Sequence, residues 1–132
     1  MRIEAVISAL LLTASCLSGC SLIDSRTEWR SGRYVLMWID EPNEVTLSYD
    51  LGDGAWKPLV DARVFAVGSD SHHIIAKQHP HGDKGITNYF ILDTSDILKS
   101  AGVTGPLSEA EFERKIKELN LPAFSKTLKS LE

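Results

Sequence analysis

Residues 34–50, YVLMWIDEPNEVTLSYD, decide the fold that this sequence predicts. The stretch opens with a continuous apolar run over residues 34–39. From Glu44 to Asp50, polar and apolar residues then alternate, which is typical of a strand with one exposed face. The residues between, 40–43, have the composition of a turn. We therefore predict a β-hairpin over residues 34–50.

Three further strands are predicted over residues 62–67, 73–78 and 87–93. The segments between them are rich in glycine, serine, aspartate or proline, as turns are. Short strands joined by turns indicate an antiparallel meander of about five strands.

The C-terminal third of the chain has helical patterns. Ser108 and Glu111 form a capping box, after which apolar residues recur on one helix face: Phe112, Ile116 and Leu119. A short helix through Lys99 and a last helix carrying Phe124, Leu128 and Leu131 are also predicted. The expected fold class is therefore α+β, with the meander followed by two or three C-terminal helices that cover one face of the sheet.

The N-terminus has the features of an export signal. The apolar run of residues 5–12 is shorter than the roughly 20 residues that cross a bilayer, and it suits the apolar part of a signal peptide. The segment Leu17-Ser18-Gly19-Cys20 resembles the bacterial lipobox, in which a leucine and two small residues precede an acylated cysteine. A secretory signal cleaved elsewhere and an apolar core helix are the alternatives.

The lipobox resemblance implies a division of the chain into three parts. Residues 1–19 would be a lipoprotein signal peptide, residues 20–32 the lipidated Cys20 and a tether, and residues 33–132 a single α+β domain. Ser21 stands where an aspartate would favour the inner membrane. The expected location is the bacterial cell envelope, on the outer membrane facing the periplasm if the source is Gram-negative.

Charge and cysteine content exclude several classes of function. The chain has a net charge of −4, whereas nucleic-acid binding relies on clustered lysine and arginine. Cys16 would leave with the signal peptide and acylation would consume the thiol of Cys20, so no thiol would remain for a disulfide or for zinc. We therefore predict no nucleic-acid partner and no cofactor.

Four histidines lie within ten residues and suggest a metal site: His72, His73, His79 and His81. On one strand, however, His73 and His79 would be about 20 Å apart. His79 and His81 are the best remaining pair, and two ligands are fewer than the four of a structural zinc site. We expect no metal site, and we keep metal binding by these histidines as the alternative function.

No catalytic motif is recognised. Ser69-Asp70-Ser71-His72 contains the residue types of a hydrolase triad, but neighbours in one turn rarely converge on one substrate. Residues 50–54 are similar to a calcium loop but lack its terminal glutamate, so we interpret them as a tight turn. We therefore predict that the protein is not an enzyme.

Two tryptophans receive separate predictions. Trp38 lies in the apolar run and is expected in the core. Trp56 lies in a segment bounded by Gly54 and Pro58, where it could anchor an interface or fold back as a lid on the core. We favour the lid.

Residues 64–70, 74–80 and 88–93 are similar to a family of small bacterial lipoproteins without an assigned function, over roughly residues 33–95. The resemblance implies no catalytic residues. We expect a non-enzymatic module, held to the membrane by lipid on Cys20, that binds a protein through a sheet edge or the loops 52–58 and 79–86. One version is an immunity protein that neutralises a toxin.

Overall fold

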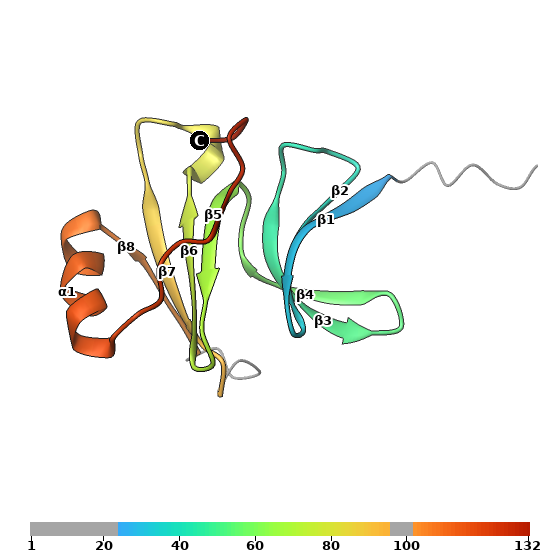
Figure 1. Ribbon diagram of the computed structural model, residues 1–132. Coiled ribbons are helices and arrows are strands. Elements are labelled where there is room, and N and C mark those ends of the chain that lie inside the picture. The colour runs from blue at the N-terminus through green and yellow to red at the C-terminus, as the bar shows by residue number, and fades with distance from the viewer. Residues whose placement is uncertain (1–23, 96–101) are drawn as a thin grey trace, which may run out of the picture.

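The computed structural model describes residues 24–95 and 102–132. These residues form nine strands, one α-helix and a short 3₁₀ turn, η1 (Pro80–Gly82), and all nine strands belong to two antiparallel sheets that face each other (Figure 1). The first sheet has four strands in chain order: β1 (Ser25–Ser31), β2 (Tyr34–Ile39), β3 (Thr46–Gly52) and β4 (Ala55–Val60). The second has five strands, in this spatial order: β8 (Val103–Leu107), β7 (Asn88–Asp93), β6 (His73–Gln78), β5 (Val64–Ser69) and β9 (Lys126–Thr127).

The predicted fold class is wrong. The protein is mostly β, with strands in two sheets, and not a single meander followed by two or three helices. Strands β2 and β6 occupy the ranges that the sequence predicts, 34–39 and 73–78. The chain leaves the first sheet after β4 and enters the second at β5, so a meander is continuous only within each sheet. This division depends on which strands find each other in space, and local periodicity carries no information about that.

The strands that the sequence does not reveal lie at or near sheet edges. Strand β1, which we predicted to be part of a tether, is an edge strand of mixed polarity with a β-bulge between Thr27 and Trp29. The bulge interrupts the alternation that marks a strand. Strand β4 is the other edge of the same sheet and contains Pro58, which is tolerated at edges. Edge strands are polar and irregular because one side faces water.

The helical predictions have three different outcomes. Helix α1 (Glu109–Leu119) is confirmed, and the Ser108 hydroxyl accepts the backbone N–H of Glu111 at 3.2 Å in the expected capping box. The last predicted helix is wrong, because its residues instead run along β5, with β9 paired to Ala66 and Val67. The predicted helix through Lys99 falls on residues 96–101, outside the described part of the chain.

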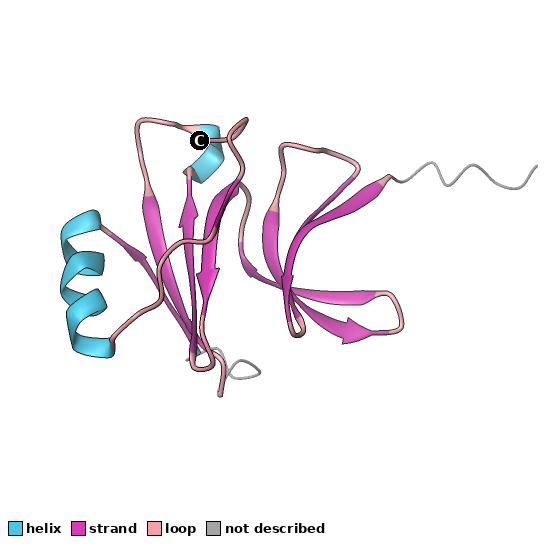
Figure 2. Cartoon of the chain, viewed as in Figure 1, coloured by secondary structure: helices cyan, strands magenta, loops and turns pink. Residues whose placement is uncertain are grey.

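Two apolar clusters hold the layers together. The larger lies between the sheets and includes Leu36 and Leu47 from the first sheet and Val67 and Leu92 from the second. The smaller lies on the outer face of the second sheet, where Phe112 of α1 stacks on Tyr89 with ring centroids 4.7 Å apart. The resulting order is helix, five-stranded sheet, four-stranded sheet (Figure 2). In the described residues, no helix covers the outer face of the four-stranded sheet.

Candidate functional site: an apolar groove on the four-stranded sheet

The outer face of the four-stranded sheet contains a groove of about 270 Å³. Side chains alternate along β2, so Leu36 belongs to the core between the sheets while Met37 and Ile39 point to the opposite face. Strand pairing places Thr46 of β3 beside Met37, and Ser48 of β3 beside Pro58 of β4. The groove is therefore built mainly from the non-core faces of three adjacent strands, and it is completed by the core residue Trp38 and by Glu44, which precedes β3.

The groove is concave because the sheet bends. The ladder between β3 and β4 shifts register twice, between Leu47 and Ser48 and between Asp50 and Gly52. Such irregularities bend and twist a strand, and Figure 1 shows β3 and β4 turning away from β1 and β2. The floor is consequently buried, with Met37 only 4% exposed. On the rim, Ile39 is 45% exposed and Trp56 is 38% exposed.

The polar groups of the groove are engaged in hydrogen bonds within the protein. The hydroxyls of Thr46 and Ser48 are hydrogen-bonded at 2.9 Å. The carboxylate of Glu44 accepts hydrogen bonds from Nε and Nη2 of Arg63, both at 3.1 Å. Among the residues that the structure describes, no histidine, cysteine or lysine lines the groove. Its residues therefore provide mainly apolar contact area, and the hydroxyl and carboxylate groups that line it are engaged in hydrogen bonds within the protein.

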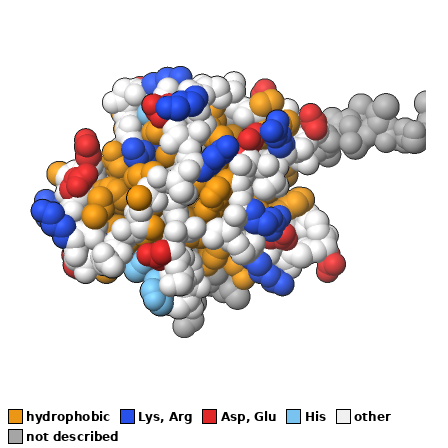
Figure 3. Space-filling view, in the orientation of Figure 1, with side chains coloured by type: hydrophobic (Ala, Val, Ile, Leu, Met, Phe, Trp, Pro, Cys, Tyr) orange, Lys and Arg blue, Asp and Glu red, His pale blue; other side chains and the backbone are white. Residues whose placement is uncertain are grey.

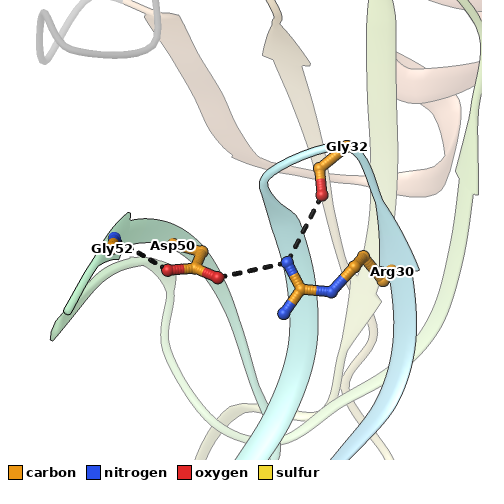
Figure 4. A network of polar contacts seen from close by, with 4 residues as sticks. All are labelled: Arg30, Gly32, Asp50 and Gly52. Carbon is orange, nitrogen blue, oxygen red and sulfur yellow. Dashed lines mark hydrogen bonds and ion pairs between the residues drawn. The ribbon is translucent and has the colours of Figure 1, made fainter. Parts of the chain in front are cut away.

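A polar network holds the hairpin that carries Trp56 (Figure 4). Arg30 of β1 donates through Nη1 to the carboxylate of Asp50 at 3.2 Å and to the carbonyl oxygen of Gly32 at 3.4 Å. Asp50 also accepts the N–H of Gly52 at 2.8 Å. The hydrogen bond from the Gly52 N–H is the largest cause that holds the pKa of Asp50 below its usual value, and the hydrogen bond and positive charge of Arg30 lower this pKa further. Because Asp50 pairs with Trp56 across the hairpin, the network positions one wall of the groove.

The two tryptophan predictions have opposite outcomes. Trp38 packs in the core between the sheets, as predicted, and its indole N–H donates to Glu28 at 3.2 Å. Trp56 is not a lid on the core: it lies on β4, belongs to neither apolar cluster and lines the groove. The lid prediction fails because residues 54–58 form the end of a hairpin, and the sequence alone suggests an irregular loop.

The four histidines lie at opposite ends of β6. His72 lies in the turn after β5, and His73 is the first residue of β6. His79 and His81 lie at the other end of β6, beside or within η1. Among the described residues, no group of three or more histidine, cysteine, aspartate or glutamate side chains is placed to hold a metal ion. The structure therefore does not bring together the four residues of the alternative hypothesis.

His79, the better of the two metal candidates, is buried in a packed environment. Its ring stacks on Phe65 with centroids 4.1 Å apart, and Nδ1 is 2.8 Å from the carbonyl oxygen of Ile86. Because a carbonyl oxygen can only accept, Nδ1 is the donor in that contact. His81 is the central residue of η1 and adopts a positive φ of 55°. The two side chains thus have separate surroundings.

The remaining sequence predictions concern turns and the N-terminus. Asp70 accepts the backbone N–H groups of His72 at 2.8 Å and of His73 at 2.7 Å, so it closes the turn after β5 and directs no histidine toward a serine. Residues 53 and 54 form the tight turn that we predicted. Cys20 lies outside the described residues. None of the helices described has the length and apolar character needed to cross a membrane.

A comparison with known families identifies a family for most of the chain. A family model described as a protein of unknown function (DUF3997) matches residues 31–132, which extend from the end of β1 to the last residue. The expected membership of an uncharacterised family is thereby confirmed, and the match continues past the predicted range of 33–95. No curated protein and no solved structure matches the chain. The chain belongs to the DUF3997 family of proteins of unknown function.

Proposed function

We propose that this protein is a lipid-anchored module of the bacterial cell envelope that binds another protein in the groove and catalyses no reaction. The observation that carries the proposal is the apolar groove itself, with Ile39 and Trp56 exposed on its rim. Large apolar side chains exposed around a concavity mark a site of interaction.

The size and lining of the groove favour a protein partner over a small molecule. Pockets for small ligands usually enclose about 300–1,000 Å³ and carry several convergent polar groups. The groove encloses about 270 Å³, and its carboxylate and hydroxyl groups are already hydrogen-bonded. This space suits one or two side chains of a partner. Tryptophan is also enriched among the residues that dominate binding energy at protein interfaces.

The anchor rests on the lipobox at residues 17–20. Only the four residues from Ser21 to Asp24 separate Cys20 from the start of β1. Fully extended, they span at most about 14 Å. Acylation of Cys20 would therefore hold the groove close to the membrane surface. A short tether of this kind raises the effective concentration of the module toward partners at the same membrane.

Photo-crosslinking in cells tests the proposal. The full-length lipidated chain would carry p-benzoylphenylalanine in place of Ile39, on the groove rim, or in place of Ile86, which lies outside the groove. The two isoleucines form a matched pair because their exposures are 45% and 49%. We expect irradiation to join the position 39 variant to one discrete protein and to leave the position 86 variant uncrosslinked. Equal crosslinking at both positions, or none at position 39, would overturn the proposal.

A further inference from the structure

We infer that the groove accepts an apolar side chain of the partner protein and that, in the partner, basic residues flank this side chain. This inference rests on the proposed function and specifies the chemistry of the partner. It is drawn from the charges at one end of the groove, where the wall formed by Ile39 meets the start of β1.

Three exposed carboxylates gather at this end: Asp24, Asp40 and Glu41. Ile39 pairs with Ser25, the first residue of β1. The backbone N–H of Asp40 donates to the carbonyl oxygen of Asp24 at 2.7 Å, and that of Glu41 donates to the carbonyl oxygen of Ile39 at 2.8 Å. These two hydrogen bonds hold the acidic residues beside the exposed Ile39. Figure 3 shows red carboxylates next to the point where the grey trace begins.

The charges of these three residues are not neutralised within the described part of the chain. Arg63 is paired with Glu44 at 3.1 Å, and Arg26 of β1 lies 3.5 Å from Glu28. In the residues that the structure describes, no ion pair involves Asp24, Asp40 or Glu41. Within residues 24–95 and 102–132, no lysine or arginine lines the groove. An apolar ligand flanked by cations would thus meet a negative electrostatic potential at this end of the groove. Such complementarity of charge raises the rate and the specificity of association.

The opposite end of the groove has a smaller negative bias. There Asp50 is paired with Arg30 at 3.2 Å (Figure 4), and Asp53, in the turn before β4, is the exposed carboxylate that remains. Charge therefore distinguishes the two ends, while apolar contact is available along the whole groove. A partner would be oriented with its basic residues toward Asp40.

The acidic end also disfavours a lipid as the occupant. The chain runs from Asp24 back to the proposed anchor at Cys20, so this end of the groove would lie near the membrane. Membrane surfaces that carry anionic lipids attract basic segments and repel acidic ones. The three carboxylates would keep the rim of the groove away from such lipids and leave it accessible to a protein.

Peptide binding tests the inference. The lipidated chain would be reconstituted in phosphatidylcholine nanodiscs, with empty nanodiscs as the blank. Two fluorescently labelled peptides would be compared, each with a central Phe-Leu pair, one flanked by two lysines on each side and the other by two glutamates. We expect the basic peptide to bind at least roughly tenfold more tightly than the acidic one, and the difference to shrink as salt screens the charges.

Variants separate the contributions of charge and apolar contact. The pair Asp40→Asn and Glu41→Gln should weaken binding of the basic peptide by roughly fivefold, as expected for two exposed charge pairs, and leave the acidic peptide no weaker. Trp56→Ala should weaken binding of both peptides. As a matched control, Glu113→Gln and Glu118→Gln on α1, which lies on the far side of the five-stranded sheet, should change neither.

The outcomes distinguish this inference from the proposed function. Equal binding of the two peptides, tighter binding of the acidic one, or no binding of either would overturn the inference. The proposed function would still stand if the crosslink at position 39 persisted. Loss of that crosslink would overturn both.

Discussion

Trp56 and Ile39 are the two large apolar side chains that the groove leaves accessible. They come from different strands, β4 and β2, with β3 between them. Neither lies in an apolar cluster, so their burial contributes little to the stability of the fold. Trp38 is only one residue from Ile39, and it is packed between the sheets while also contributing to the lining of the groove. Ile39 and Trp38 therefore differ in their contribution to the core, although both border the groove.

Trp56→Ala should separate these two roles. We expect a change of at most about 1 kcal/mol in the free energy of unfolding, because the side chain is exposed on an edge strand. The crosslink from position 39 should fall by tenfold or more, since interface tryptophans often contribute about 2 kcal/mol or more. Urea unfolding and gel densitometry measure the two effects.

Trp38→Ala is the matched control for the loss of an indole. Truncation of a buried tryptophan usually costs about 3–5 kcal/mol. A Trp56→Ala variant destabilised to the same extent would show that Trp56 is part of the core after all.

The role of Cys20 is a prediction from the lipobox alone. Cys20→Ser removes the thiol that would carry the lipid, and membrane attachment by acyl chains depends on burial of their methylene groups. We expect the variant to move from the membrane fraction to the soluble fraction on centrifugation of lysed cells. Continued sedimentation with the membranes, after a carbonate wash, would contradict lipidation at this residue.

At the scale of elements, three turns begin with an aspartate that accepts backbone N–H groups from residues further along the chain. Asp50 accepts the N–H of Gly52, Asp70 accepts those of His72 and His73, and Asp93 accepts that of Ser95. Hydrogen bonds to a carboxylate favour its charged form. The pKa of each of these aspartates lies below its usual value of 3.8. The largest cause is the hydrogen bond from the Gly52 N–H for Asp50, from the His72 N–H for Asp70 and from the Ser95 hydroxyl for Asp93.

These lowered pKa values predict destabilisation in acid. A carboxyl with a lower pKa in the folded state contributes stability above its unfolded pKa, and this contribution is lost as the pH falls through the folded pKa. We expect the urea midpoint to be lower at pH 3 than at pH 7. The triple variant Asp50→Asn, Asp70→Asn and Asp93→Asn should show a smaller difference between the two pH values. An unchanged difference in the triple variant would mean that other groups govern acid stability.

At the scale of the whole molecule, the last residues join the layers. The segment after α1 passes along β5, where the N–H of Ser125 donates to the carbonyl oxygen of Val67 at 2.9 Å and that of Leu128 donates to the carbonyl oxygen of Phe65 at 2.7 Å. Leu131 then enters the core between the sheets. The C-terminal segment therefore protects an edge strand that would otherwise be free to pair with another chain.

Gly68 makes this close approach possible. A methyl group at this position would overlap with the backbone carbonyl oxygen of Ala123. Gly68→Ala should therefore displace the C-terminal segment, lower the urea midpoint and speed amide hydrogen exchange at Ser125 and Leu128. Gly85→Ala is the control, since the nearest atom there is a side-chain oxygen of Asp83 at 3.1 Å, which can move. Equal exchange in wild type and in Gly68→Ala would contradict this role.

The sequence by itself determined the features that depend on near neighbours along the chain. The apolar runs of β2 and β6, the capped helix α1 and the core position of Trp38 all follow from local periodicity and capping chemistry. The lipobox is likewise a local pattern, and its function remains a prediction. Membership of an uncharacterised family agrees with the resemblance seen in the strands.

Only the tertiary structure decided how the strands divide into two sheets and where the groove lies. Edge strands such as β1 and β4 pair with only one neighbouring strand, so their sequences show only weakly the alternation that predicts a strand. The groove joins Ile39, Thr46 and Trp56, whose proximity depends on the register of β2, β3 and β4 and on the bend of the sheet. Register and curvature result from pairing between distant segments, which no local pattern of residues specifies.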